Sequence, residues 1–292
     1  MNLTVSTWNI NSVRLRIDQV GRFLKERRPD ILCLQETKCP NDKLPLRELQ
    51  SFGYPFVVHM GQKGYNGVAI LSRYPFSETT VMEMCGRQDA RHITVTLSRE
   101  AKAAAGCVIH NFYVPAGGDI PDPGLNEKFR HKLDFMAELR AWGGRARPAS
   151  GPAILVGDLN VAPLEHDVWS HKQLLDVVSH TPAETAALEE LRQEAGWVDA
   201  MRRVRPERDS GTMMLRSSSI GGGSSKIRTL AAGTLWARAL PAESSAARVA
   251  RPARRWRSGW NMRATLSCCG WLAADGVGCR CRKARARPWV RL

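Results

Sequence analysis

The chain has 292 residues, of which 43% are hydrophobic and 24% are charged, proportions that are ordinary for a soluble globular protein. They exclude a collagen-like, fibrous or wholly disordered chain. Apolar runs such as residues 153–156 are far too short to span a bilayer. The N-terminus has neither the basic nor the apolar segment of a secretory signal, so we expect a protein of the reducing cytoplasm.

The formal net charge of +15 is concentrated at one end of the chain. Residues 208–292 hold 17 Lys and Arg against 3 Asp and Glu, a balance of +14, whereas residues 1–207 hold 26 against 25. A strongly basic protein is a candidate nucleic-acid binder. Because the charge belongs to the tail, it indicates nothing about what the first 207 residues bind.

The tail also differs in composition. All seven His, all four Tyr and all seven Phe precede residue 208, and the tail has no sustained period of 2 or 3.6. Its excess of Arg, Ala, Ser, Gly, Trp and Cys is what a GC-rich gene yields when it is read out of frame, so we interpret residues 208–292 as a frameshifted segment. A basic disordered tail that contacts nucleic acid nonspecifically is one alternative. Another is a metal site at four cysteines whose spacing matches no common zinc pattern: Cys268, Cys269, Cys279 and Cys281.

Residues 1–207 alternate between patterns typical of strands and of helices. In chain order, strands are predicted over residues 3–10, 30–36, 56–60, 68–72, 92–97, 107–114 and 153–156, and helices around residues 13–24, 129–139 and 181–195. Asn66-Gly67 between two strands is a hairpin signal, and Thr181 with Glu184 makes a capping box at the start of the last helix. Residues 153–156 are apolar on both faces and predict a central strand. The alternation predicts a mixed α/β layered domain.

Polar, oxygen-bearing residues stand at the ends of several predicted strands, where the sites of layered α/β proteins are built. Glu36 ends an apolar strand, so its carboxylate is either paired, solvated or bound to a cation, and it suits Mg²⁺. Asn9 ends the first strand and could supply an amide oxygen nearby, or be a turn residue.

A second polar pair directly follows the predicted central strand. Asp158 and Asn160 are two residues apart, which in an extended segment points both side chains the same way. The carboxylate could accept a proton from water while the amide fixes the water or a phosphate oxygen, although a plain turn has the same pattern. Tyr113 either packs in the core or supports a developing oxyanion. Asn66 is first of all a turn former.

Taken together, these segments resemble the exonuclease III family of DNA-repair nucleases, within the endonuclease/exonuclease/phosphatase superfamily. The most specific motifs are Leu-Gln-Glu-Thr-Lys at residues 34–38 and Gly-Asp-Leu-Asn-Val-Ala-Pro at residues 157–163. Residues 127–135 and Gly-Trp-Val-Asp-Ala at residues 196–200 also look like the nuclease branch. The resemblance covers residues 1–207.

The resemblance implies an α/β fold, a DNase I-like two-sheet sandwich flanked by helices. It implies a phosphodiesterase that depends on Mg²⁺, with Mn²⁺ as an alternative, and that acts on duplex DNA with abasic sites or 3′ ends. The implied activities are cleavage 5′ to an abasic site, 3′→5′ exonuclease action and removal of 3′ blocking groups. A monomer with no membrane partner is expected.

The resemblance also assigns roles to individual residues. Glu36 and Asn9 resemble metal ligands, joined by Asp158 and Asn160. Asp158 resembles the residue that activates the attacking water, and Asn160 and Tyr113 resemble the groups that contact the scissile phosphate. Two further residues are expected to bind substrate, Asn66 and Lys128.

The chain departs from the family in its last quarter. The family's Trp-rich strand, its Arg-x-Asp strand and its Ser-Asp-His motif are all missing, and residues 208–292 contain no His. We therefore expect residues 1–207 to be an incomplete catalytic domain, with the C-terminal strands missing or disordered and the chemistry impaired. Ala116 stands where the family usually has Asn, and His110, His166 and His180 are expected to be surface or packing residues.

Two other functions fit parts of the sequence. A phosphatase of the same superfamily, acting on phospholipid or inositol phosphates, shares the Mg²⁺ site but usually lacks the motif at residues 34–38. A noncatalytic DNA-binding protein would use the residual Mg²⁺ site and the basic tail, and would bind with steep salt dependence. A cleavage assay beside a salt titration of DNA binding separates these functions.

Overall fold

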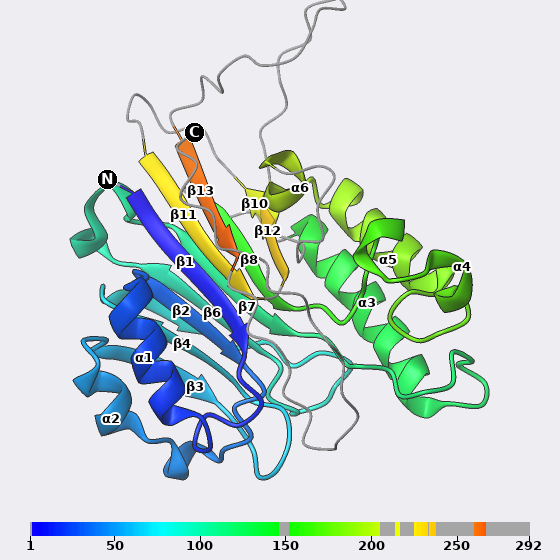
Figure 1. Ribbon diagram of the computed structural model, residues 1–292, viewed down its shortest axis with the longest axis horizontal. Coiled ribbons are helices and arrows are strands. Elements are labelled where there is room, and N and C mark those ends of the chain that lie inside the picture. Colours follow the sequence, from blue (N-terminus) through cyan, green and yellow to red (C-terminus); the bar gives the residue numbers. More distant parts are fainter. Residues whose placement is uncertain are drawn as a thin grey trace, which may run out of the picture.

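A computed structural model of the chain describes residues 2–145 and 152–204 together with four strand segments of the tail. Two β-sheets pack face to face, and helices cover the outer face of each (Figure 1). This arrangement confirms the expected α/β sandwich of two sheets flanked by helices. Among the described residues, no helix is both long enough and apolar enough to cross a membrane.

The first sheet is built around the parallel pair β1 and β2, and its strand order is β13-β11-β1-β2-β4-β3. β3 and β4 pair antiparallel and are joined by residues 61–67, which end in Asn66-Gly67, so the hairpin is confirmed. The strands of this sheet are β1 (Asn2–Asn9), β2 (Ile31–Gln35), β3 (Phe56–Met60), β4 (Val68–Ser72), β11 (Ser225–Ala232) and β13 (Trp260–Leu266).

The second sheet is built around another parallel pair, β7 and β8, and its strand order is β5-β6-β7-β8-β12-β10-β9. β8 lies in the interior of the sheet, which confirms the central strand that was expected at residues 153–156. The strands are β5 (Phe76–Thr80), β6 (His92–Leu97), β7 (Val108–Tyr113), β8 (Ala153–Asp158), β9 (Val198–Asp199), β10 (Met214–Arg216) and β12 (Thr234–Ala237).

Four segments of the tail therefore pair with the sheets, and here the structure differs from the expectation that the C-terminal strands are missing. β11 pairs with β1 and β12 with β8, at edges whose backbone N–H and C=O groups would otherwise lack partners. Backbone pairing depends little on side-chain identity, which is why a segment without a strand pattern can still occupy a sheet edge. The four tail cysteines lie outside the described residues.

The core is layered because successive side chains of a strand point to opposite faces. In β2, Ile31 and Cys33 belong to the core between the sheets, whereas Leu32 and Leu34 pack beneath the helices of the first sheet. Since both faces are covered, every residue of β2 is buried and the strand reads as a continuous apolar run.

Helices complete the outer layers. α1 (Ile17–Arg27) and α2 (Leu46–Ser51) cover the first sheet, and α3 (Glu127–Arg145) and α5 (Pro182–Glu194) cover the second (Figure 1). The capping box of Thr181 and Glu184 at the start of α5 is confirmed. Shorter helices lie in the connections, namely α4 (His171–Leu174), α6 (Ala200–Val204), η1 (Asn41–Lys43), η2 (Arg99–Ala104) and η3 (Glu165–Asp167).

Candidate active site

The two parallel strand pairs end at the same edge of the sandwich, and each carries polar residues there. Asn9 is the last residue of β1 and Glu36 follows β2, both in the first sheet. Tyr113 and Asp158 are the last residues of β7 and β8 in the second sheet and stand opposite each other in register. Side chains from both sheets can therefore meet at this edge.

The amide of Asn9 joins the two carboxylates. Its Nδ2 donates to Glu36 Oε1 at 2.8 Å and to Asp158 Oδ2 at 2.7 Å, so the two acidic side chains converge on one nitrogen atom. Its Oδ1 accepts the backbone N–H of Asn11 at 3.1 Å. Only the NH₂ end of the amide can donate to two carboxylates, so Asn9 turns its Nδ2 toward them and its Oδ1 toward the backbone of Asn11.

Glu36 is surrounded by donors. Tyr113 donates its hydroxyl to Glu36 Oε1 at 2.9 Å, and Lys38 Nζ lies 2.9 Å from Glu36 Oε2. Burial acts to raise the pKa of Glu36, but hydrogen bonds from Asn9, Lys38 and Tyr113 outweigh it, and the pKa falls below its usual value. Glu36 is therefore a carboxylate at neutral pH. Burial and the charge of Glu36 raise the pKa of Tyr113, which keeps its hydroxyl protonated as a donor.

At Asp158, the effects that raise the pKa outweigh those that lower it. Burial raises its pKa and the neighbouring charge of Glu36 adds to this, while donors at Asn9 and Asn160 oppose the rise. The donor from Asn160 is its backbone N–H, which lies 3.1 Å from Asp158 Oδ1. The pKa values of the two carboxylates thus shift in opposite directions, because burial dominates at Asp158 whereas the donors outweigh burial at Glu36.

Asn160 follows β8 in a left-handed conformation, which fits the turn that was left open and not the extended segment. Its φ of 51° is left-handed, so the extended geometry expected between Asp158 and Asn160 is wrong. Its Nδ2 donates to the carbonyl of Val114 at 2.8 Å. In the part of the chain that the structure describes, no hydrogen bond occupies Asn160 Oδ1.

Left-handed backbone is common to the strand ends of the site. Such a conformation costs a residue with a Cβ about 1 kcal/mol and persists only where surrounding contacts hold it, which is frequent at functional sites. Here hydrogen bonds between neighbouring strand ends hold it. The residues concerned are Asn11, Glu36, Lys38, Asn66 and Asn160, with φ between 46° and 52°.

The two predicted substrate-binding residues lie differently. Asn66 is buried and braces a loop, since its Nδ2 donates to the carbonyl of Asp89 at 2.9 Å and its own carbonyl accepts the N–H of Lys38 at 2.9 Å. Lys128 is exposed in the first turn of α3, and the structure shows no contact between it and either carboxylate within the described ranges. The structure therefore does not join Lys128 to the group around Glu36.

Comparison with known proteins assigns the chain to a family. The sequence pattern described as the Endonuclease/Exonuclease/phosphatase family matches residues 6–257. The chain belongs to this family. The matched range runs past residue 207, where the resemblance carried by the motifs ends, into the basic tail.

Individual proteins with similar sequences support this assignment. The chain is 29% identical to exodeoxyribonuclease III of Haemophilus influenzae over 209 residues, which cover 68% of this chain and 75% of that protein. It is 29% identical over 218 residues to DNA repair nuclease APEX1 of Danio rerio, covering 70% of this chain and 64% of the relative. As a member of the family with such relatives, it is a hydrolase of the phosphodiesterase type, a DNA-repair nuclease or phosphatase.

Solved structures show the same fold. An AP endonuclease from Archaeoglobus fulgidus has a TM-score of 0.64 and 33% identity, covering 73% of this chain and 78% of that one. A single-residue variant of the 3′ phosphatase NExo from Neisseria, bound to a product DNA hairpin, has a TM-score of 0.62 and 31% identity, covering 70% of this chain and 75% of that one.

Two residues that contact the candidate site were not identified from the sequence. Lys38 contacts Glu36 and also donates to Asn11 Oδ1 at 2.6 Å. The guanidinium of Arg91 lies over the Tyr113 ring, 4.9 Å from its centroid, and donates to the Tyr113 carbonyl at 3.2 Å. Lys38 belongs to the motif at residues 34–38 and could have been proposed from it, whereas only the pairing of β6 with β7 brings Arg91 to Tyr113.

A buried polar network lies beneath the site and ties the two sheets together. Gln35 donates to Asn111 Oδ1 at 2.6 Å and to Thr7 Oγ1 at 2.9 Å. Asn111 in turn donates to the carbonyls of Leu34 and Ala69, each at 3.0 Å. A polar Gln at the end of the apolar run before Glu36 is the signal that could have revealed it. The network fixes β7 against β2 and β4, and so fixes Tyr113 relative to Glu36.

The oxygen atoms of the site suit Mg²⁺, a hard cation that takes few protein ligands and retains several waters. Two carboxylates converge, and Asn160, whose backbone N–H bonds Asp158, has a side-chain oxygen with no hydrogen bond among the described residues. The ammonium of Lys38 against Glu36 shows that positive charge is accommodated at this edge. Within the described ranges, no cluster of three or more His, Cys, Asp and Glu side chains could hold a metal, so a bound ion would depend on amide oxygens and water as well.

Proposed function

We propose that the chain is a Mg²⁺-dependent DNA-repair nuclease, a 3′→5′ exodeoxyribonuclease and abasic-site endonuclease that hydrolyses phosphodiester bonds in duplex DNA. One observation carries the proposal: Glu36 and Asp158 converge on Asn9 from different sheets, with the Tyr113 hydroxyl on the same Glu36. The relatives named for exodeoxyribonuclease III and AP endonuclease support it. The proposal includes a monomer that acts in the cytoplasm.

Glu36, Asp158 and Asn160 are the residues proposed to hold the metal. When bound, Mg²⁺ or Mn²⁺ neutralises charge on the phosphodiester and makes water a better nucleophile. Glu36 suits this role because its donors keep it ionised. Asn9 orients the two carboxylates through its Nδ2, so we assign it a positioning role in place of the expected metal ligand.

Asp158 and Tyr113 are proposed to act on the reacting atoms. Asp158 is the more basic carboxylate and would accept a proton from the attacking water. The Tyr113 hydroxyl stays protonated and would donate to the negative charge that develops on the phosphate. Since the Nδ2 of Asn160 is already bonded to Val114, the oxygen of its amide is the atom left for ligation.

We also propose that the reaction is slow. The sequence contains no Asp-His dipeptide, and neither Glu36 nor Asp158 has a histidine partner in the part of the chain that the structure describes. Acid–base catalysis by one group typically contributes about 10²–10⁴-fold, which sets the scale of the loss.

The test uses the full chain and a duplex oligonucleotide with one abasic site. We expect Mg²⁺-dependent cleavage that EDTA abolishes and that Glu36→Gln and Asp158→Asn remove. A second duplex with a 3′ phosphate detects the phosphatase activity named for the Neisseria relative. Absence of cleavage of both duplexes at high enzyme concentration would contradict the proposal.

The basic tail favours a second candidate, noncatalytic DNA binding. Its balance of +14 predicts binding that weakens steeply as salt rises. Binding without cutting in the same experiment would support this candidate, and a frameshift in the tail would be revealed by resequencing the coding DNA around codon 207. Hydrolysis of an inositol phosphate in place of DNA would instead favour the superfamily phosphatase.

A further inference from the structure

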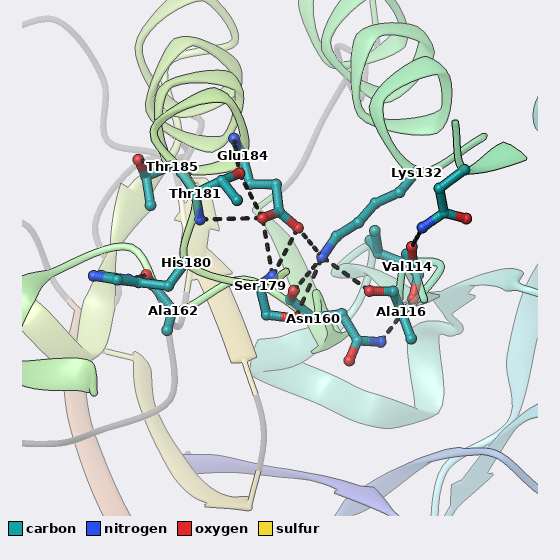
Figure 2. A network of polar contacts seen from close by, with 12 residues as sticks. Val114, Ala116, Lys132, Asn160, Ala162, Ser179, His180, Thr181, Glu184 and Thr185 are labelled. Atoms are coloured by element: carbon teal, nitrogen blue, oxygen red, sulfur yellow. Dashed lines mark hydrogen bonds and ion pairs between the residues drawn. The ribbon is translucent and has the colours of Figure 1, made fainter. Parts of the chain in front are cut away.

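The ammonium group of Lys132 on α3 contacts three other segments of the chain next to the candidate site, namely residues 179–184, Asn160 and Ala116 (Figure 2). Lys132 on α3 and Glu184 at the start of α5 form an ion pair, and both side chains are 0% exposed. Lys132 Nζ also donates to the carbonyl of Asn160 at 2.6 Å, to the carbonyl of Ala116 at 3.3 Å and to Ser179 Oγ at 3.4 Å. The loops that follow β7 and β8 are thereby joined to α3 and α5.

Glu184 is itself firmly held. Its carboxylate accepts the backbone N–H of Ser179 at 3.0 and 2.9 Å and the hydroxyl of Thr181 at 2.7 Å (Figure 2). These bonds belong to the cap of α5, so the carboxylate cannot move without breaking the start of that helix. The ammonium of Lys132 is therefore anchored to a rigid element and not to a mobile side chain.

Asn160 receives the shortest of the hydrogen bonds from Lys132 to uncharged groups. Three of its polar groups are engaged: its N–H with Asp158, its Nδ2 with Val114 and its carbonyl with Lys132. Its left-handed backbone needs such restraint. With the peptide group fixed from both sides, Asn160 Oδ1 has a set position relative to Asp158.

We propose that Lys132, oriented by Glu184, is a positioning residue that holds Asn160 and through it the loop after Asp158. The inference rests on the proposed function, because fixed geometry at these atoms matters when they act on one phosphodiester. A buried ion pair is a poor device for stability alone, since an apolar pair of similar volume is often as stable or more so. Its use here is explained by the donors that it supplies to two loops of the site.

The first test does not depend on activity. In Lys132→Met, the backbone N–H of Asn160 and its side-chain NH₂ should exchange with solvent faster and shift in NMR spectra, while the amides of β2 stay unchanged. Leu24→Ala is the matched control, because it removes core packing under α1 on the other side of the molecule. Unchanged exchange at Asn160 in Lys132→Met would overturn the proposal, as would equal changes at Asn160 in Leu24→Ala.

The second test separates positioning from folding. Lys132→Met leaves Glu184 buried without its partner, so it should unfold at lower urea, whereas Lys132→Met combined with Glu184→Gln should regain much of that stability. The double variant still lacks the donor to Asn160. We expect its kcat on abasic DNA to stay about 100-fold down, with KM nearly unchanged, as misplacement of a reacting group predicts.

Recovery of kcat together with stability in the double variant would overturn the positioning role. If the unaltered chain cleaves no DNA, the proposed nuclease function fails, and the exchange measurement still decides whether Lys132 holds Asn160. The two failures are thus distinguishable.

Discussion

Asn9 and Asp158 end strands in different sheets, and a hydrogen bond of 2.7 Å joins their side chains. The same Asn9 nitrogen bonds Glu36 at 2.8 Å. This amide therefore joins the two sheets at the candidate site, as the hydrogen bond from Tyr113 to Glu36 also does. Burial and the charge of Glu36 raise the pKa of Asp158, and the donor that the two carboxylates share opposes this rise.

Asn9→Ala should leave these carboxylates without their common donor. Their mutual repulsion then moves them apart, and we expect the rate of abasic-site cleavage to fall about 100-fold. Steady-state cleavage of the abasic duplex measures the effect. The control is Gln50→Ala, which removes an exposed hydrogen bond to the carbonyl of Pro55. It should leave the rate of cleavage unchanged. A normal rate in Asn9→Ala would refute the positioning role of this amide.

Tyr113→Phe removes one hydroxyl and keeps the ring beneath Arg91. The variant should fold normally and bind DNA as before, because the ring contact and the backbone pairing of β7 are retained. Loss of a donor to developing charge predicts a fall in kcat of about 10²–10³-fold. Single-turnover cleavage measures it, and a fall in DNA affinity with unchanged kcat would contradict the role assigned to the hydroxyl.

The buried pair of Gln35 and Asn111 predicts a non-additive pattern of stability. Asn111→Leu removes a hydrogen-bond partner of the buried Gln35 amide and should lower the free energy of unfolding by about 1–3 kcal/mol or more. Gln35→Leu in the same chain removes this unpaired amide, so the double variant should lose less stability than the sum of the two single variants. Urea unfolding measures all three, and strictly additive losses would show that the two amides do not depend on each other.

Buried histidines predict sensitivity to acid. Burial and the adjacent His110 hold the pKa of His92 well below 6.5, and burial lowers the pKa of His59 to about 4. As the pH falls, the histidines of the unfolded chain take up protons near pH 6.5, before those of the folded chain do. Stability from this source is therefore complete above about pH 6.5 and is lost below it, at up to about 1.4 kcal/mol per pH unit for each histidine.

Urea unfolding at pH 7.5, 6.0 and 5.0 checks this slope. His92→Gln removes one of the two groups and should flatten the dependence, since Gln can still bond the N–H of Met82 and the hydroxyl of Thr94. The same slope with and without His92 would show that its burial is not the cause.

Much of the site could be predicted from the sequence alone because the ends of strands can be recognised in it. Glu36 ends an apolar run and Asp158 follows another, and both lie where two sheets meet. The prediction for Asn160 assumed an extended backbone, and the left-handed turn at φ 51° made that assumption wrong. Lys128 has the residue type expected of a phosphate contact and is exposed, and its role in substrate binding stays a prediction because the described residues show no contact between it and the two carboxylates.

What the sequence by itself determined was local: which segments alternate as strands, where α5 is capped and which strand ends carry oxygen atoms. These follow from periodicity and capping, which act over a few residues. Only the tertiary structure decided which strand ends meet, that Asn9 offers a donor to both carboxylates, and that Lys132 is buried where four distant segments converge. Such contacts depend on how the sheets and helices pack, and periodicity along the chain carries no information about partners that lie far away in the sequence.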